Sequence, residues 1–204
     1  MLEHEGAVAV STTEIAEESN RALMADSRKE ADSELLIVIA AGELRALEAL
    51  YLRYHPRLAR FLRRFTRRYE TLEETINDTF MTVWRTAAEF PRDSQVSTWI
   101  FGIAYRTALR SAHRETNHTA ARNLDERLKQ TVDPVLDTEV QDWVERGLER
   151  LPDEQRLTVE LAYNMGQSLE EIAEISGTPV QTVRTRMFDA RQEWYRYLSA
   201  AGLF

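Results

Sequence analysis

Four side chains that can recognise DNA recur on one face of a predicted helix near the carboxyl end of the chain. They are Gln181, Arg184, Thr185 and Phe188. Because residues three and four positions apart are neighbours on a helix, these four share one side. A guanidinium group can pair with guanine edges or with phosphate, and an aromatic ring can touch a thymine methyl group. The chemistry that this face offers is non-covalent recognition of duplex DNA.

Two short helices joined by a tight turn are predicted to position this face. The first helix opens with Ser168 and Glu171, a capping box in which each side chain satisfies a backbone N–H at the helix start. Gly177 suits the turn, and Thr178 before Pro179 predicts a second cap with proline at the first helical position. This is the pattern of a helix-turn-helix motif, whose second helix enters the major groove. The alternative is a helical hairpin with a merely solvated charged face.

The opposite side of the second helix is predicted to face a core. Its apolar residues recur at spacings of three and four and are Val180, Val183, Met187, Ala190 and Trp194. Asp189 and Glu193 place negative charge close to the arginines. These two acids disfavour tight contact with phosphate.

The composition excludes several other kinds of chemistry. The 204 residues include no cysteine, which excludes disulfides, thiol nucleophiles and thiolate zinc sites. The four histidines stand at positions 4, 55, 113 and 118, with no pair at metal-ligand spacing. Neither a glycine-rich phosphate loop nor a nucleophile–base motif occurs, so we expect no enzyme activity, no cofactor and no metal. With no membrane-length apolar run and no signal-peptide pattern, we expect no membrane insertion and a cytoplasmic location.

The net charge of −8 is unusual for a DNA-binding chain, but the charges are unevenly distributed. The segment 53–68 carries seven arginines and no acid, whereas acids gather in the first 34 residues and in 125–154. We therefore expect DNA contacts through local basic faces, with a larger partner supplying most of the affinity.

Helical periodicity runs through the whole chain and predicts an all-α fold with two small helical domains. The predicted parts are an acidic flexible leader (1–32), a first domain (33–115), a flexible linker (116–138) and a second domain (139–204). In the first domain, residues 33–68 read as continuously helical apart from a restart at Pro56. Thr71 and Glu74 form a further capping box that would open the next helix.

A loop at 90–97 and a helix from about 98 to 115 complete the first domain. The outer face of this helix carries aromatic and cationic residues: Trp99, Tyr105, Arg106, Arg110, His113 and Arg114. Planar rings for unstacked bases and charge for the backbone are what single-stranded DNA binding needs, and the short polar loop could hold a flipped base. The alternative is that Trp99 and Tyr105 belong to the core and the arginines are solvated.

Together these segments resemble the extracytoplasmic-function (ECF) sigma factors, initiation subunits of bacterial RNA polymerase. The resemblance covers roughly residues 33–200. It is carried in the first domain by 50–56, 72–84 and 90–104, and in the second by Leu151-Pro152 and 168–191. Both regions occur in the family order with a short linker between them.

The resemblance implies three sets of binding residues. The minus-35 set is Gln181, Thr182, Arg184, Thr185, Arg186, Phe188 and Arg191. The minus-10 set is Phe90, Arg92, Asp93, Ser94, Trp99, Tyr105, Arg106, Arg110, His113 and Arg114. The polymerase set is Glu73, Glu74, Asn77, Asp78, Phe80 and Trp84. The implied partners are promoter DNA, core RNA polymerase through its β′ clamp helices and β flap, and an anti-sigma factor.

Departures from the family pattern concern both DNA and polymerase. Family members usually carry asparagine where this chain has Arg106, so minus-10 specificity is expected to be unusual. Thr71, Thr75 and Thr79 lie one turn apart on the predicted polymerase surface, where phosphorylation would add about −1.5 to −2 charges; the alternative is that they are simply tolerated in a helix. A stand-alone helix-turn-helix regulator remains the competing function, although it would have no need of residues 71–114.

Overall fold

The computed structural model describes residues 30–66, 68–119, 147–148 and 150–200, and for 113–119 the helical backbone. Within these ranges every regular element is helical, which confirms the all-α prediction. The elements are α2 (Leu44–Leu62), α3 (Tyr69–Thr86), η1 (Ala87–Glu89), α4 (Val96–Thr119), α6 (Asp153–Val159), η2 (Glu160–Asn164), α7 (Leu169–Ser176) and α8 (Val180–Ala200). No helix in the described ranges is both long and apolar enough to cross a membrane.

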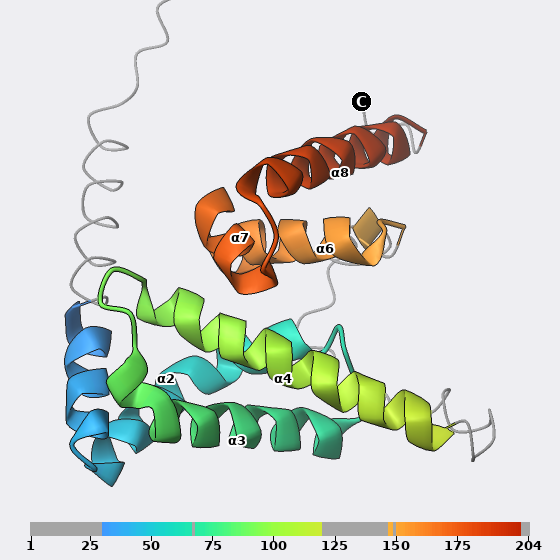
Figure 1. Ribbon diagram of the computed structural model, residues 1–204. Helices are drawn as coiled ribbons and strands as arrows, with labels where there is room; N and C mark the ends of the chain where they lie inside the picture. The colour runs from blue at the N-terminus through green and yellow to red at the C-terminus, as the bar shows by residue number, and fades with distance from the viewer. Residues whose placement is uncertain (1–29, 67, 120–146, 149, 201–204) are drawn as a thin grey trace, which may run out of the picture.

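The first domain packs α2, α3 and α4 around one apolar core, with the helix at 30–40 against its side (Figure 1). The largest fully buried side chains of this domain include Leu50, Leu58, Phe61, Ile76 and Phe101. Phe61 and Phe101 meet edge to face with ring centroids 5.3 Å apart, an arrangement that aromatic quadrupoles favour.

Asp32 fastens the helix at 30–40 to α2. Its carboxylate accepts hydrogen bonds from the Tyr54 hydroxyl at 2.7 Å and from the Arg53 guanidinium. Asp32 and Tyr54 are both buried. Burial, followed by the hydrogen bond to Asp32, raises the pKa of Tyr54 well above its ordinary value. The buried acid is thus paired, as a charge in a protein interior must be.

The helix predicted over 33–68, with a restart at Pro56, is wrong about where the helix is interrupted. The chain turns at Ala41 and Gly42, and Gly42 has a φ of 91°, which favours glycine. In contrast, α2 continues through Pro56 without restarting. Proline removes one backbone N–H, but the apolar face of α2 on both sides of Pro56 is buried, so packing holds the helix together.

The capping box predicted at Thr71 is also wrong. Helix α3 begins two residues earlier, at Tyr69, with Arg68 in the cap position and Glu70 in the first turn. Thr75 and Thr79 are only 4% and 0% exposed. Their hydroxyls donate to the carbonyls of residues four positions earlier. As folded, neither hydroxyl is accessible for phosphorylation, and neither lies on a docking surface.

The second domain contains the predicted helix-turn-helix. The capping box of α7 is present, with Glu171 N–H donating to Ser168 Oγ at 3.2 Å and Ser168 N–H donating to Glu171 Oε2 at 2.7 Å. Gly177 ends α7 in the left-handed region, with a φ of 66°. Helix α8 begins at Val180, and the Thr178 hydroxyl lies 2.7 Å from that of Ser176. The helix thus starts one residue after the predicted first position, Pro179, whose carbonyl accepts from the Val183 N–H at 3.2 Å.

The core side of α8 is as predicted. Val183, Met187 and Ala190 are buried, and Trp194 is partly buried against a small cluster that contains Leu148 and Leu151. Preceding α7, the helical backbone widens into a π-helical turn at η2. Such turns are rare and occur often at functional sites.

The two domains pack directly on each other, as Figure 1 shows for α7 over α4. One buried apolar cluster contains Phe101 and Ile100 of the first domain together with Leu161, Ile172 and Ile175 of the second. Most of the predicted leader and linker, 1–29 and 120–138, lies outside the described residues, and residues 116–119 belong to α4.

Candidate nucleic-acid interface

The outer face of α8 presents most of the predicted minus-35 set to solvent. The exposed members are Gln181, Arg184, Thr185, Phe188 and Arg191, whereas Thr182 and Arg186 are half-buried. Phe188 is 62% exposed. An exposed phenyl ring among guanidinium groups has no packing role, so this face is suited to contact with bases.

Each arginine of this face has a partner outside the recognition helix. Arg184 Nη2 lies 3.2 Å from Glu170 Oε1, and Arg191 Nη2 donates to the Tyr163 hydroxyl at 3.0 Å. Arg186 pairs with Glu154 of α6. The pKa of Glu170 is lowered, first by a hydrogen bond to its own backbone N–H and then by Arg184. Glu170 and Glu154 therefore offset the charges of Arg184 and Arg186, whereas the partner of Arg191 is an uncharged hydroxyl.

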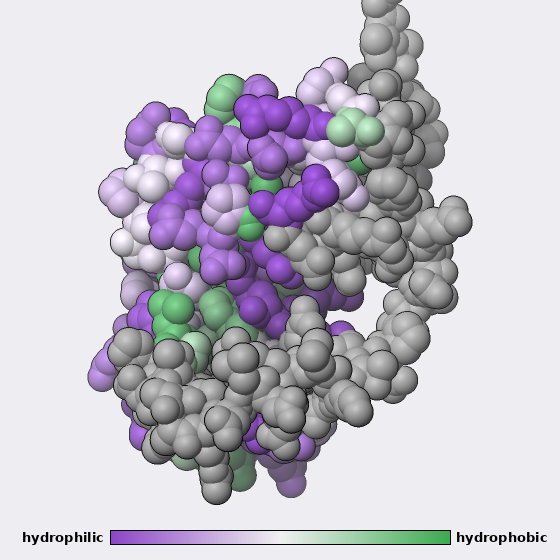
Figure 2. Space-filling view, turned by 90° about the vertical axis from the view of Figure 1, so that its right-hand side faces the viewer, coloured by the Kyte–Doolittle hydropathy of each residue, from purple (hydrophilic) through white to green (hydrophobic). Residues whose placement is uncertain are grey.

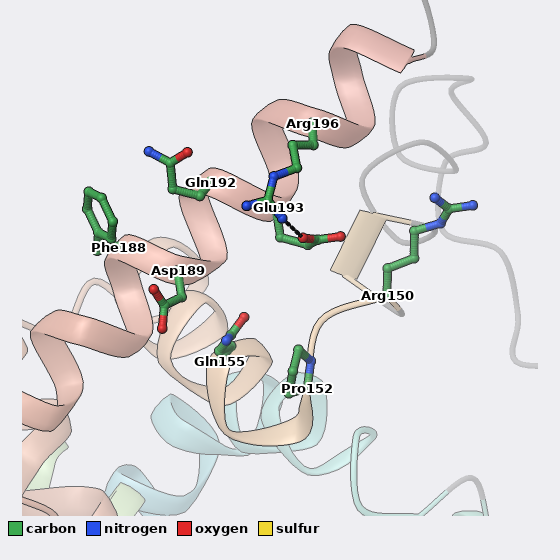
Figure 3. Close-up of a pocket in the computed structure, with 8 residues that line it drawn as sticks. All are labelled: Arg150, Pro152, Gln155, Phe188, Asp189, Gln192, Glu193 and Arg196. Carbon is green, nitrogen blue, oxygen red and sulfur yellow. Dashed lines mark hydrogen bonds and ion pairs between the residues drawn. The ribbon is translucent and has the colours of Figure 1, made fainter.

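An open groove of about 720 Å³ runs beside this face, between α8 and the start of α6. Figure 3 shows Asp189 directed toward Gln155, whereas Phe188 and Gln192 project away from α6. Arg150 and Arg196 offset the acids Asp189 and Glu193 in its lining. Figure 2 shows mostly hydrophilic side chains on the second domain in this view, with small hydrophobic patches. The groove is therefore suited to a polar or charged partner and not to an apolar one.

The aromatic residues of the predicted minus-10 set are neither fully exposed for contact with DNA bases nor fully buried in the core. Phe90 and Trp99 meet edge to face with centroids 5.3 Å apart, and Tyr105 lies 5.9 Å from Phe65. All three predicted members are half-buried and packed against the first-domain core. One side of each ring therefore serves packing while part of it remains accessible.

The polar members of the minus-10 set differ in accessibility. Arg92, Asp93, Arg106 and Arg110 are exposed. Arg110 Nη2 donates to the Thr107 hydroxyl at 3.1 Å, and the Arg106 guanidinium folds back over Gly102. The side chains of His113 and Arg114 lie outside the described residues.

Ser94 and the neighbouring Thr98 face the second domain. The Ser94 hydroxyl donates to Glu174 Oε1 at 2.8 Å. The Thr98 hydroxyl lies 3.1 Å from both Gln167 Oε1 and Glu171 Oε1. The structure thus brings the loop at 90–97 against the acidic side of α7, a juxtaposition that the sequence did not indicate.

The predicted polymerase set divides into exposed and buried residues. Glu74, Asn77 and Asp78 are exposed on α3. Phe80 is 3% exposed, so its assignment to the docking surface is corrected: the side chain packs against Tyr51 in the core. Trp84 is half-buried against the same core.

The predicted member Glu73 is half-buried, and one apolar residue each on α2 and α3 is exposed. Glu73 is held by His55, whose Nε2 lies 3.1 Å from Glu73 Oε2 and 3.2 Å from Oε1. Met81 and Leu52 are 52% and 67% exposed. The signal for Met81 was present in the sequence, because it lies four residues after Asn77 and three after Asp78 on one helix face.

Two arginines of the basic segment serve the contact between domains instead of DNA. Arg57 Nη2 donates to the Met165 carbonyl at 3.1 Å, and its guanidinium lies 5.3 Å from the Phe101 ring centroid. Arg64 Nη1 lies 3.0 Å from Glu160 Oε2. Burial lowers the pKa of Arg64, while Glu160 opposes that shift. The expected basic face on 53–68 is therefore smaller than its arginine count suggests.

Two family models match this chain, one in each domain. Residues 50–118 match Sigma-70 region 2, and residues 141–193 match Sigma-70 region 4. The ECF RNA polymerase sigma factor SigM of Mycobacterium tuberculosis H37Rv is 31% identical over 167 residues, which is 82% of this chain and 84% of that protein. The RNA polymerase sigma-H factor of Pseudomonas aeruginosa PAO1 is 28% identical, covering 80% of this chain and 92% of that protein.

Solved structures show the same fold. CnrH in complex with the cytosolic domain of CnrY matches with a TM-score of 0.61 at 24% identity, over 83% of this chain and 98% of that chain. The sigma factor RpoE of Bartonella quintana, in complex with the anti-sigma factor NepR, matches with a TM-score of 0.57 at 22% identity, over 74% of this chain and 96% of that chain.

Proposed function

Because this chain belongs to the ECF family of RNA polymerase sigma factors, we propose that its first domain docks on core polymerase while both domains contact the promoter. The chain is a sigma factor for promoter recognition. The observation that carries the proposal is the outer face of α8, where arginines and an exposed phenyl ring stand on a capped helix-turn-helix. Such a face reads base edges in the major groove.

We assign minus-35 recognition to this face of α8. Arg184 and Thr185 are placed to reach base edges, and Phe188 is placed to contact a thymine methyl group. Arg191 and Tyr163 lie at the edge of the face, where phosphate contacts would fix the register. Their exposure supports this assignment.

We assign minus-10 recognition to the loop at 90–97 and the exposed side of α4. Trp99 and Tyr105 would stack on unpaired bases, and Arg106 and Arg110 would neutralise the strand. Arg106 stands where the family usually has asparagine, so the captured base should meet a cation rather than an amide.

We assign docking on the polymerase clamp to the exposed side of α3. Its members are Glu73, Glu74, Asn77 and Asp78, and we include Met81 because it is exposed on the same helix. Methionine is enriched in protein interfaces, and the polar residues beside it would form the solvent-accessible rim. In this scheme the polymerase carries out the chemistry in the cytoplasm, and this chain supplies recognition without enzyme activity.

Run-off transcription with bacterial core polymerase and a library of promoters tests the function. The expected result is a complex with core and specific transcripts that depend on this chain. If no complex with core forms and the chain alone shifts duplex DNA specifically, the sigma function is wrong and the stand-alone regulator is right.

Two charge reversals separate the assigned surfaces. Asp78→Lys should weaken the complex with core polymerase without changing promoter preference, since Asp78 is exposed on α3. Glu34→Lys, an equal charge change at an exposed position on the helix at 30–40, serves as the control and should leave core binding unchanged. Equal loss in both variants would remove the α3 assignment.

A further inference from the structure

We propose that Arg186 is a positioning residue, which aims the reading face of α8 without touching DNA itself. The inference deepens the proposed function and rests on it, because it concerns how the assigned minus-35 face is held. By family resemblance Arg186 belongs to the residues that contact the minus-35 element. Its orientation, its two partners and the hydrogen bonds that continue from them give it the other role.

Arg186 lies on a different side of α8 from the residues assigned to DNA. It is two positions from both Arg184 and Phe188, and residues two apart on a helix do not share a face. Its side chain is 17% exposed, whereas that of Arg184 is 55% exposed. Asp189, three positions after Arg186 and therefore on its side of the helix, is directed toward Gln155 of α6 (Figure 3). This side of α8 thus faces α6, away from the reading face.

The Arg186 guanidinium bridges two elements on either side of the recognition helix. Its Nη2 pairs with the carboxylate of Glu154 in the first turn of α6. Its Nη1 lies 3.5 Å from the hydroxyl oxygen of Thr178, in the turn between α7 and α8. The rigid fork of a guanidinium group suits such a double contact, because its donors are fixed relative to one another. One side chain therefore ties α8 to the helix before the motif and to the turn inside it.

The contact with Thr178 begins a chain of hydroxyl hydrogen bonds that ends on α7. Ser176 Oγ donates to the Ile172 carbonyl at 2.7 Å, and a hydroxyl has only one proton to donate. Ser176 must therefore accept from Thr178, whose hydroxyl oxygen lies 2.7 Å away. Thr178 spends its own proton on Ser176, so its oxygen accepts from Arg186. The donors run in one direction, from a cation to a carbonyl, and aligned hydrogen bonds strengthen one another.

These four residues form the Arg186 network: Glu154, Arg186, Thr178 and Ser176. The buried residues of α8 hold the helix against the core, but apolar contacts are not directional. Directional bonds on one flank are needed to fix the rotation of α8 about its axis. Recognition groups must be held within about 0.5 Å of their productive geometry. Loss of the network should therefore reduce discrimination between bases more than overall attraction to DNA.

Binding of holoenzyme to promoter fragments, each with one base pair changed in the minus-35 element, tests this role. Arg186→Gln removes the guanidinium, and Glu154→Gln removes its partner from a side chain that is 70% exposed. The measured quantity is the ratio of affinities for the preferred and the changed fragment, because attraction to phosphate is the same for both. Both variants should lower this ratio by about fivefold, the lower end of what one base contact contributes. The double variant should lose no more than either alone, since both changes break the same pair.

Asp153→Asn is the matched control. Asp153 is a second exposed acid in the first turn of α6, so its removal changes the same charge at the same helix end and leaves Glu154 and Arg186 paired. Its affinity ratio should equal that of the parent chain. Circular dichroism and urea unfolding show that each variant is folded. Because Glu154 is exposed, Glu154→Gln tests the network even if Arg186→Gln fails to fold.

Three results would overturn the positioning role. One is weaker binding to every fragment in Arg186→Gln alone, with a salt dependence shallower by about one unit, which would show that Arg186 binds a phosphate. Another is an affinity ratio that neither Arg186→Gln nor Glu154→Gln changes. The third is an equal loss in Asp153→Asn, which would assign the effect to the charge of α6. A parent holoenzyme with no preference among the fragments would count against the proposed function instead.

Discussion

Arg64 and Glu160 are 96 residues apart in the chain and form a 3.0 Å ion pair between the two domains. Their surroundings are unequal. Glu160 keeps a second guanidinium partner in Arg156, whereas Arg64 has Glu160 as its ionic partner and the Asp153 carbonyl as its other acceptor. Removing one partner of a buried pair leaves an uncompensated charge, while replacing both with apolar groups is often neutral.

The first prediction follows from this inequality. Glu160→Met should lower the free energy of unfolding by about 3 kcal/mol because it strands Arg64. Arg64→Met should cost less, about 1–2 kcal/mol, since Glu160 retains Arg156. The double variant should recover most of the loss. Urea unfolding followed by circular dichroism measures all three, and additive losses in the double variant would show that the two side chains do not act as a pair.

A second prediction concerns alkaline pH. Burial and the hydrogen bond to Asp32 raise the pKa of Tyr54 above its ordinary value. Above pH of about 10 the unfolded chain loses the phenolic proton while the folded chain keeps it, so stability falls as pH rises, by up to about 1.4 kcal/mol per pH unit. Below that pH the stabilisation by the protonated Tyr54 hydroxyl is fully present.

Tyr54→Phe isolates this effect. It removes the hydroxyl and leaves Asp32 with Arg53, so stability at pH 7 should fall by about 1.5–3 kcal/mol for a lost bond to a charged group. Between pH 10 and 11 the free energy of unfolding should fall less steeply with pH in this variant, because one tyrosine no longer contributes to the fall. Thermal unfolding measured from pH 7 to 11 checks both parts. An unchanged slope would mean that Tyr54 titrates normally in the folded chain.

A third prediction uses two glycines of opposite conformation. Gly177→Ala should lower the free energy of unfolding by about 1 kcal/mol, because an alanine at a φ of 66° is strained. An added Cβ at Gly177 would meet nothing within 4 Å, so the cost arises from the backbone alone.

Gly102→Ala is the matched control for this change. Gly102 lies within α4, and the three atoms nearest to an added Cβ all belong to the flexible end of Arg106, the first at 3.3 Å. Higher helix propensity should make this variant as stable as the parent chain or more so. The urea unfolding midpoints of the two variants show whether the loss is specific to Gly177. Equal losses at both positions would indicate a general intolerance of alanine instead of strain at the turn.

Structural features that depend on residues close together in the sequence could be predicted, whereas features that depend on distant residues could not. The Ser168–Glu171 capping box and the turn at Gly177 are local, and both are confirmed. Helix α2 persisted through Pro56 because its buried face outweighs one lost hydrogen bond. Helix α3 began at Tyr69 despite a plausible cap at Thr71, and because Tyr69 and Glu70 are both exposed, packing does not explain this earlier start. Local signals fail where packing against distant residues decides.

The candidate site shows the same division. Helical spacing was sufficient to place Gln181, Arg184 and Phe188 together on an exposed face. It could not show that Ser94 contacts Glu174, because nothing in either local sequence specifies a partner 80 residues away. Phe80 was assigned to the docking surface by the family resemblance, although its helical spacing with Ile76 and Val83 places it on the face that the structure buries.

The last prediction concerns competition on the reading face. Arg184, on the outer face of α8, lies 3.2 Å from the carboxylate of Glu170 on α7, and both side chains are exposed. Arg184→Ala should weaken binding to minus-35 DNA by about 1–3 kcal/mol if the guanidinium reads a base. Glu170→Gln should act in the opposite direction, because it removes a negative charge beside the phosphates and frees the guanidinium for DNA.

Holoenzyme binding to promoter fragments over a range of salt concentrations tests both changes. Glu170→Gln should raise affinity several-fold at low salt, and its advantage should shrink as salt screens the carboxylate in the parent chain. In an Arg184→Ala background the same glutamine should give a smaller gain, because part of its effect acts through the arginine. Equal gains in both backgrounds would show that Glu170 repels DNA directly and does not compete for Arg184.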